Sequence, residues 1–332
     1  MANDREHVLV TGGAGFIGSS LVRHLLTEGR RVTVADRVRW RDARLLHGVR
    51  DGPPDAGKLR YVEADITSAE ACRKLVTGQS VIFHLASNTE NRAALAVRDT
   101  DSAVTLGGTI TMLEAAAGAD TEAFILASSQ LVYGSGNTGV VPEDQAVRPE
   151  SRFAAAKAAA EAFLSAYARE SGFRGVACRL SNVVGEHMRR GVVFDLASQL
   201  ARDPARLTVL GDGRQARNFL YVDDCVTALL AASEHGASKH GAGPFDVFNV
   251  CGAETTSIAR VAEIVCAESG AAGVAVRFGS GASGWAGDVP VLEMSAARLR
   301  ACGWRPQVGS DEAVRRMARA VLGRRGREET TA

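Results

Sequence analysis

The stretch VLVTGGAGFIGS, residues 8–19, decides the fold of this chain. It opens with a short apolar run, which is typical of a buried strand, and continues into a glycine-dense turn. Leu21, Val22, Leu25 and Leu26 then recur at the spacing of one helix face. The stretch therefore predicts a strand, a tight turn and an amphipathic helix.

The glycines of this turn have the spacing of a dinucleotide-binding site. Gly13, Gly15 and Gly18 satisfy G-x-G-x-x-G, and Gly12, Gly15 and Gly18 satisfy G-x-x-G-x-x-G. One glycine permits the tight bend, one lets the backbone approach a pyrophosphate, and one lets the helix pack closely on the sheet. Free N–H groups at the helix start attract the phosphates. The predicted cofactor contacts here are Gly12, Gly15, Phe16, Ile17 and Gly18.

An acidic residue follows at the distance that such a site requires. Residues 31–35 form a second apolar run that ends in Asp36, about 20 residues after the glycines. A carboxylate there accepts hydrogen bonds from a ribose 2′-hydroxyl and repels a 2′-phosphate, which favours NAD over NADP. Arg37 is also placed at the cofactor, and its charge weakens that preference slightly.

The composition is that of an ordinary globular protein. Of 332 residues, 46% are hydrophobic and 23% are charged, and the formal net charge is +1. The charge gives no indication of a nucleic-acid or membrane partner. No apolar run is long enough to span a bilayer, and residues 1–7 lack the apolar core of a signal peptide. We therefore expect a cytoplasmic protein that acts on a small molecule.

The six cysteines are scattered and form no C-x-x-C pair or metal-like cluster with histidine. We expect them to be reduced, buried, small apolar side chains, and we expect no metal site. The cysteines are Cys72, Cys178, Cys225, Cys251, Cys266 and Cys302.

Strand and helix patterns alternate through the first half of the chain. This alternation predicts an α/β fold of the Rossmann type, a doubly wound parallel sheet with helices on both faces and a smaller C-terminal substrate lobe. The expected further strands are 61–66, 81–87, 123–127 and 175–180, and the expected helices are about 102–117 and 153–169. We assign residues 1–182 to the NAD-binding domain, 183–322 mainly to the substrate lobe, with interleaved segments, and 323–332 to a disordered tail.

Residues at the carboxyl ends of these strands are candidates for cofactor contacts, because ligands bind there in such sheets. The candidates are Asp65, Ile66, Leu85, Ala86, Ser87 and Ser128. Small residues after the strand 81–87 let the chain pass close to a cofactor. His84 lies within that strand, and we interpret it as a core histidine whose hydrogen bonds are satisfied.

Motifs along nearly the whole chain resemble those of one family. They are TGGAGFIG (11–18), FHLA (83–86), SSQLVYG (128–134), Lys157, RLSNV (179–183), LGDG (210–213), RNFLYVDD (217–224) and CGWRP (302–306). In this order they resemble an extended short-chain dehydrogenase/reductase. Within that group the chain is similar to the NAD-dependent nucleotide-sugar epimerase/dehydratase branch.

This resemblance implies that a tightly held NAD takes a hydride from a sugar carbon. The transient ketone then allows inversion, elimination or decarboxylation, and the hydride usually returns. A Ser or Thr, a Tyr and a Lys handle the protons in this family. Ser129 matches the first and Lys157 the last, which also holds the nicotinamide ribose and contributes a positive field. Asn182 and Arg217 match substrate-phosphate contacts, for which an arginine fork is suited.

The resemblance also implies a homodimer. The two small-residue helices at about 102–117 and 153–169 are our candidates for its interface.

One departure from the family motif concerns the proton chemistry. The expected Tyr-x-x-x-Lys reads FAAAK at residues 153–157, and Phe153 has no titratable group. Either another group transfers the proton, or the chemistry avoids it, or the protein is not an efficient redox enzyme. Ser129 is one candidate relay. Glu90, Glu186 and His187 are others, although ordinary solvated side chains on the protein surface explain these three more simply.

Two further departures concern the substrate. Dehydratases of this family carry Asp-Glu where this chain has Gln130-Leu131, which counts against a usual 4,6-dehydratase. The family's Arg-x-Gly-Asp reads WAGD at residues 285–288, so one phosphate clamp is missing and Trp285 is available for stacking. Asp288 is kept as a predicted substrate contact.

The sequence thus predicts an NAD-dependent nucleotide-sugar epimerase or related lyase with a non-standard proton-transfer group. Two alternatives stay open. One is an NAD-dependent enzyme acting on an unusual sugar or specialised metabolite. The other is a non-catalytic NAD-binding protein.

Overall fold

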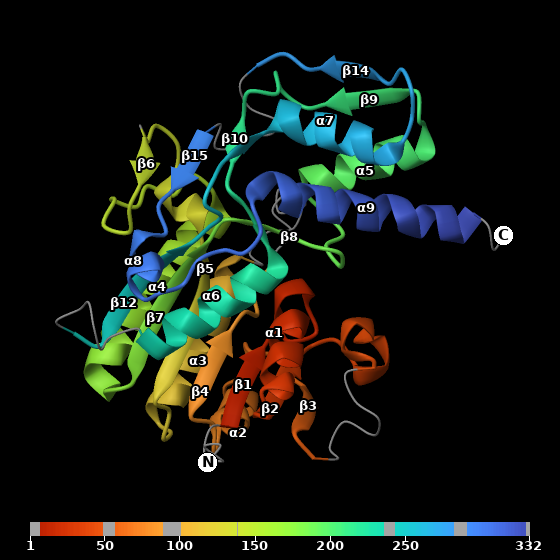
Figure 1. The fold of residues 1–332 in the computed structure, drawn as a ribbon. Helices are drawn as coiled ribbons and strands as arrows, with labels where there is room; N and C mark the ends of the chain where they lie inside the picture. The colour runs from red at the N-terminus through yellow and green to blue at the C-terminus, as the bar shows by residue number, and fades with distance from the viewer. Residues whose placement is uncertain are drawn as a thin grey trace. The chain divides into compact units, whose positions relative to one another are not determined.

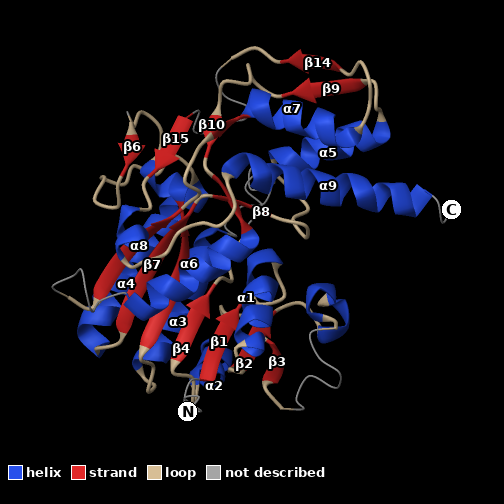
Figure 2. Cartoon of the chain, in the orientation of Figure 1, coloured by secondary structure: helices blue, strands red, loops and turns tan. Residues whose placement is uncertain are grey.

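The computed structural model describes residues 7–48, 57–88, 101–137, 139–235, 243–281 and 291–329. Within these residues, seven strands form one sheet in the order β12-β7-β5-β4-β1-β2-β3 (Figures 1 and 2). The pairs from β3 to β5 are parallel. The strands are β1 (His7–Thr11), β2 (Arg31–Asp36), β3 (Leu59–Glu63), β4 (Val81–His84), β5 (Ala123–Ser129), β7 (Arg174–Leu180) and β12 (Phe245–Val250).

The central strands are buried on both faces, as expected for a parallel sheet covered by helices. Val8, Leu9 and Val10 of β1 are at most 1% exposed. On one face, Leu9 belongs to a core built with the helices α2 (Ala69–Val76), α3 (Gly108–Ala117) and α4 (Arg152–Ser171). The helix α1 (Phe16–Thr27) packs against β1 and β2. The predicted Rossmann-type fold is confirmed.

Local sequence explains why α4 begins and ends where it does. The Ser151 hydroxyl accepts a hydrogen bond from the Ala154 N–H (3.2 Å), which caps the helix start. Nine alanines within 20 residues give strong helix propensity. Gly172, with φ +78°, ends the helix in the left-handed conformation that glycine adopts most readily.

Several expected boundaries differ in the structure. The strand expected at 61–66 is β3, Leu59–Glu63, because Asp65 begins a side-chain-bonded turn instead. The strand expected at 81–87 ends at His84. The helix expected at 102–117 begins with a wide π-type segment, η4 (Asp101–Gly107), before α3. The outer strand β12 was not among the predicted elements.

The chain divides into two compact units. The first comprises residues 1–132, 149–179 and 226–248. The second comprises residues 133–148, 180–225 and 249–332. Each unit is built from segments that are far apart in the sequence.

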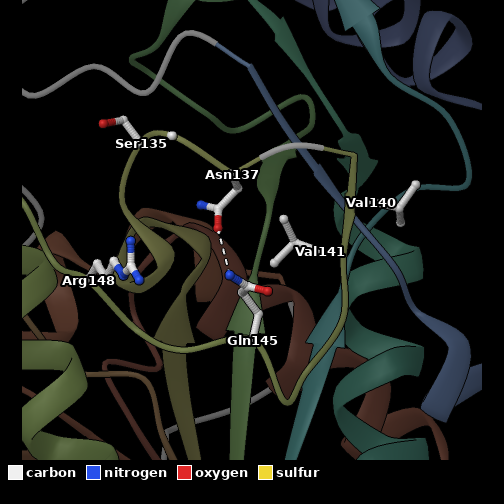
Figure 3. Close-up of a pocket in the computed structure, with 7 residues that line it drawn as sticks. Ser135, Asn137, Val140, Val141, Gln145 and Arg148 are labelled. Carbon is white, nitrogen blue, oxygen red and sulfur yellow. Dashed lines mark hydrogen bonds between the residues drawn. The ribbon is translucent and has the colours of Figure 1, made fainter.

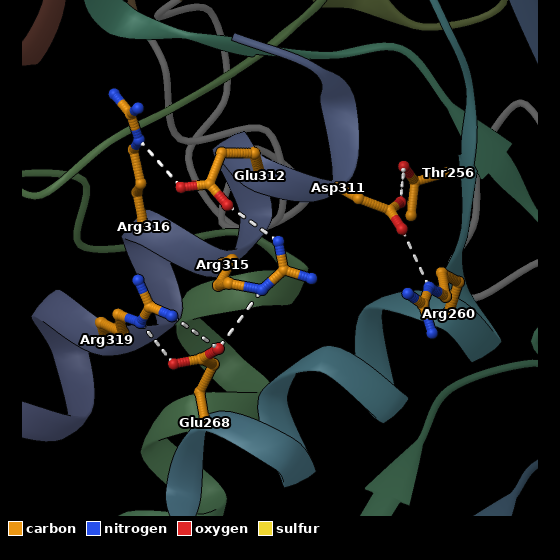
Figure 4. Close-up of polar contacts among 8 residues, drawn as sticks. All are labelled: Thr256, Arg260, Glu268, Asp311, Glu312, Arg315, Arg316 and Arg319. Carbon is orange, nitrogen blue, oxygen red and sulfur yellow. Dashed lines mark hydrogen bonds and ion pairs between the residues drawn. The ribbon is translucent and has the colours of Figure 1, made fainter.

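The second unit contains short strands and three helices that pack on one another. Its helices α5 (Val192–Arg202), α7 (Ile258–Ser269) and α9 (Ser310–Glu329) contact each other pairwise. Glu268 of α7 forms ion pairs with Arg315 (3.3 Å) and Arg319 (2.5 Å) of α9, as Figure 4 shows. Its described strands include β6 (Val140–Val141), β8 (Asn182–Val184), β9 (Arg206–Val209), β10 (Ala216–Arg217), β11 (Phe219–Tyr221), β13 (Thr256–Ser257), β14 (Ala275–Phe278) and β15 (Val291–Met294).

The tail expected to be disordered from residue 323 is instead helical as far as Glu329, because α9 continues through it. Its arginines and glutamates are good helix formers, and the segment extends a helix that is already nucleated.

Four of the six cysteines are buried and two are half-buried, and all six are free thiols. Burial raises the pKa of the Cys225 thiol to about 12. The expectation of buried side chains is confirmed for these four cysteines and is wrong for Cys266 and Cys302. In the described part of the chain, no helix combines the length and the apolar character that a membrane span requires.

Candidate functional site

The glycine turn between β1 and α1 has no room for side chains at two positions. Gly12 has φ +69°, and a Cβ there would lie 2.7 Å from the backbone nitrogen of Ala86. A Cβ on Gly18 would lie 2.2 Å from the carbonyl oxygen of Gly12. No side chain caps the start of α1 at Gly15. The turn therefore presents bare backbone and an uncapped helix N-terminus, which suits a pyrophosphate.

Asp36 lies beside this turn. The parallel register pairs Thr11 with Ala35, so β1 and β2 end side by side. The Asp36 carboxylate accepts hydrogen bonds from the Ala14 N–H (3.0 Å) and the Val38 N–H (3.1 Å). A carboxylate held against the turn can accept a hydrogen bond from a ribose hydroxyl of the cofactor. The Arg37 side chain is exposed next to it.

Two other predicted contact segments lie in the same unit. The Asp65 carboxylate accepts hydrogen bonds from the backbone N–H and the hydroxyl of Thr67, which lower its pKa. Ile66 is buried. The backbone of Leu85 and Ala86 is bonded to Thr11, and Leu85, Ala86 and Ser87 are half-buried. Their contacts with a cofactor stay predictions.

His84 is a core residue, as predicted. It is fully buried, with Nδ1 2.9 Å from the Thr11 hydroxyl and Nε2 3.1 Å from the Thr109 hydroxyl. The Thr109 hydroxyl donates to the Thr105 carbonyl, so it accepts the hydrogen of Nε2. Burial, assisted by the charge of Lys157, lowers the pKa of His84 to about 3. The ring is therefore neutral, and its one N–H hydrogen is bonded to the Thr109 hydroxyl.

Lys157 reaches the carboxyl end of β5 from α4. Its side chain is buried, and Nζ donates a hydrogen bond to the Ala127 carbonyl (2.6 Å). The Phe153 ring centroid, one helical turn earlier, lies 5.9 Å from Nζ. Burial lowers the pKa of Lys157 to about 8, and the negative charge of Glu161 opposes that shift.

A buried ion pair lies beside Lys157 and was not predicted from the sequence. Glu161 and Arg179 are bonded through three N–H···O contacts of 2.7 to 3.2 Å, and both side chains are 7% exposed. The Ser128 hydroxyl donates to the same carboxylate. Ser128 thus directs its side chain at this cluster. The one sequence feature that could have identified Glu161 is its position four residues after Lys157, on the same face of the predicted helix.

Ser129 is the last residue of β5 and is half-buried. Its oxygen accepts a hydrogen bond from the Leu131 N–H (3.2 Å), so the hydroxyl hydrogen is available to an acceptor. Both residues therefore lie at the carboxyl end of β5. Ser129 is the last residue of the strand, and Lys157 is hydrogen-bonded to the Ala127 carbonyl of the same strand.

The second unit contains two predicted substrate contacts. Asn182 begins β8 and pairs with Phe219 of β11, while Arg217 ends β10 two residues earlier. Arg217 is 7% exposed and donates to the Ala216 carbonyl (2.7 Å). The two residues belong to different sheets of this unit, and their contact with a substrate phosphate stays a prediction. Glu90, Trp285 and Asp288 lie outside the described residues, and Glu186 and His187 lie on a loop with Glu186 exposed.

The second unit also contains a polar cavity of about 130 Å³ (Figure 3). A hydrogen bond from the Gln145 amide to the Asn137 carbonyl oxygen (3.1 Å) crosses it. The cavity is formed by the segment between β5 and α4, which was not identified as a site from the sequence. The lining residues are Ser135, Gly136, Asn137, Val140, Val141, Gln145 and Arg148.

Comparison with known proteins gives a consistent result. The model of the "NAD dependent epimerase/dehydratase family" matches residues 8–251. A UDP-glucose 4-epimerase from Mycolicibacterium smegmatis is 32% identical, over 92% of this chain and 95% of that protein.

Two solved structures share the whole fold. A UDP-galactose 4-epimerase crystal structure has a TM-score of 0.82 and 30% identity, and the alignment covers 96% of this chain and 99% of that one. The dTDP-glucose 4,6-dehydratase DesIV from Streptomyces venezuelae, solved with NAD bound, has a TM-score of 0.84 and 26% identity, with 96% and 98% covered. The chain therefore belongs to the NAD dependent epimerase/dehydratase family, and its cofactor is NAD, as the glycine turn and Asp36 predict.

Proposed function

We propose that the protein is an NAD-dependent nucleotide-sugar epimerase or related lyase that works through transient oxidation of a sugar carbon. One observation carries this proposal. Lys157 and Ser129 meet the carboxyl end of β5 in the same unit that holds the glycine turn and Asp36. A cofactor turn and groups for proton transfer are the two parts that such a reaction needs.

In this proposal, separate groups of residues bind the cofactor, contact the reacting hydroxyl and bind the substrate. The glycine turn and Asp36 hold the dinucleotide, and Lys157 holds the nicotinamide ribose. NAD, when bound, accepts and returns a hydride. Ser129 contacts the reacting hydroxyl, while Asn182 and Arg217 bind the nucleotide-sugar phosphates and Asp288 contacts another part of the substrate. The epimerase and dehydratase among the relatives support this substrate class.

Epimerisation is favoured over an ordinary 4,6-elimination. Leu131 stands where an acidic side chain protonates the leaving hydroxyl in the dehydratases of the resemblance, and leucine has no proton to give. Elimination by another route is the lyase alternative within the same proposal.

Phe153 favours two competing proposals. A remodelled pocket fits an unusual sugar or specialised metabolite, and the loss of a titratable group fits a non-catalytic NAD-binding protein. Retention of both Ser129 and Lys157 supports the catalytic proposals, because a cofactor sensor has no use for proton transfer.

We also propose a homodimer that pairs the η4–α3 and α4 helices of two chains. Phe163 is 41% exposed on the outer face of α4. Ala155, Ala159, Ala162 and Ala166 accompany it at helical spacing, which gives a thin apolar surface suited to close packing.

The test uses the purified protein with its bound nicotinamide cofactor identified by mass spectrometry. Uridine, thymidine and guanosine diphosphate sugars are added singly, reduced nicotinamide is followed by absorbance, and products are identified by NMR. We expect a new sugar from at least one substrate. Lys157→Ala should abolish turnover, whereas Lys74→Ala, on the exposed face of α2, should retain it. If no sugar nucleotide gives reduced nicotinamide or a new product, a non-sugar substrate or a non-catalytic role would be favoured.

A further inference from the structure

Among the described residues of the first unit, the neighbourhood of Phe153 contains a single nitrogen that is buried and able to gain and lose a proton. Phe153 itself offers none, although its ring lies 5.9 Å from Lys157 Nζ. His84 is held neutral between two threonine hydroxyls and has no free lone pair. The Ser129 hydroxyl, without a base beside it, is too weak an acid to lose its proton. Lys157 is therefore the remaining candidate.

The charges around Lys157 leave its ammonium form poorly stabilised. Glu161 lies one turn away on α4, but Arg179 and the Ser128 hydroxyl already occupy its carboxylate. Asp101 of η4 accepts a hydrogen bond from Asn88. Glu114 of α3 is bonded to Tyr167.

Across the described residues, no carboxylate lies within ion-pair distance of Nζ, which is 2.6 Å from a neutral carbonyl. A buried amine in such a place loses its proton more readily than an exposed one.

We propose that the amine of Lys157 is the proton acceptor that replaces the missing phenol, with the Ser129 hydroxyl carrying the proton from the substrate. This inference rests on the proposed function. Ser129 is two residues beyond Ala127, whose carbonyl holds Nζ, and its hydroxyl hydrogen is available. The half-buried Ser129 and the buried amine thus lie at the same end of β5.

The proposed proton transfer passes from the substrate hydroxyl through Ser129 to Lys157. The substrate O–H bond breaks as its proton binds to Ser129 Oγ, and the original Ser129 proton forms a new N–H bond at Nζ. The amine becomes an ammonium. The electron pair of the O–H bond forms the carbonyl of the keto-sugar as the carbon loses a hydride to NAD. Reversal of both transfers regenerates the amine.

The resting protein provides a direct test, because the chain has only four lysines, Lys58, Lys74, Lys157 and Lys239. Protein labelled with carbon-13 at the lysine ε position is titrated by NMR, and Lys157→Arg identifies the missing signal. Burial lowers the pKa of Lys157 to about 8, so we expect its signal to titrate well before that of Lys74. A midpoint shared with Lys74, near the ordinary value of about 10.4, would overturn the proposal.

The pH profile of turnover tests the same group during catalysis. We expect the rate of the native enzyme to rise with pH, with the midpoint that NMR gives for Lys157. Lys157→Arg, which cannot deprotonate, should lose about 10²–10⁴-fold in turnover at every pH while still binding NAD. Ser129→Ala should lower turnover but leave the NMR midpoint of Lys157 in place.

Two outcomes separate this inference from the proposed function. Turnover that persists in Lys157→Arg, or that follows a different midpoint, overturns Lys157 as proton acceptor and leaves the enzyme intact. Absence of turnover with every sugar nucleotide overturns both proposals. Phe153→Tyr completes the test, because a restored phenol should move the rate midpoint away from the NMR value of Lys157.

Discussion

At the scale of single residues, the cofactor turn depends on two distinct properties of glycine. Gly12 needs a positive φ, and it also needs the space that a Cβ would take from the Ala86 backbone. Gly48 has an equally positive φ of +77°, but a Cβ there would meet nothing within 4 Å. A comparison of Gly12 with Gly48 therefore distinguishes the cost of a positive φ from the cost of placing a Cβ against neighbouring backbone.

We predict that Gly12→Ala removes NAD binding and destabilises the protein far more than Gly48→Ala. The control should cost only about 1–2 kcal/mol for a left-handed alanine. Thermal unfolding and NAD titration of both variants measure the difference. Equal losses of stability, with NAD affinity retained in Gly12→Ala, would contradict the role given to close approach.

At the scale of elements, α4 brings three functional positions to one face of a helix. Phe153, Lys157 and Glu161 follow each other at intervals of four residues, and Glu161 connects the helix to β7 through Arg179. The family motif predicted the first two positions. It did not predict the ion pair, because a contact between residues 18 positions apart depends on how α4 packs against the sheet.

We predict that Glu161→Gln destabilises the protein by about 3–5 kcal/mol, because it leaves the Arg179 guanidinium buried without its countercharge. Glu70→Gln breaks an exposed pair with Lys74 on α2 and should cost at most about 1 kcal/mol. Urea unfolding of both variants gives the comparison. A loss in Glu161→Gln no greater than in Glu70→Gln would show that this pair does not stabilise the fold.

At the scale of the whole molecule, the sequence predicted most of the sheet and the cofactor turn. Apolar runs separated by helical patterns identified five strands of the sheet around β1, and the glycine spacing identified the ligand end. The edge strand β12 was not predicted, because it follows a long excursion and two polar residues, Asp246 and Asn249, interrupt its short apolar run. Asn182 and Arg217 came from the resemblance alone, since the strand pairing that places Asn182 opposite Phe219 is not visible in the sequence.

Global stability should decrease in acid partly through His84. Its pKa is about 3 in the folded protein and about 6.5 in the unfolded chain, so the unfolded chain binds the proton first. This contribution to stability is present above pH 6.5 and is lost as the pH falls from about 6.5 toward 3.

We predict that His84→Gln shows a shallower decline in unfolding free energy across this range, by up to about 1.4 kcal/mol per pH unit. His24→Gln, at an exposed site on α1, should follow the native slope. Denaturant unfolding at several pH values measures each slope. A native slope in His84→Gln would assign the acid sensitivity to other groups.

The interleaving of the chain has a consequence for synthesis on the ribosome. At one edge of the sheet, the last two strands are β7 and β12. The ribosome does not reach β12 until residues 245–250. Until then the nascent chain carries β5 or β7 as an open edge with unpaired backbone groups, which invites pairing with other chains. The sheet of the cofactor-binding unit is therefore complete only after three-quarters of the chain has been translated, and a chaperone that shields the open edge until then would raise the yield of native protein.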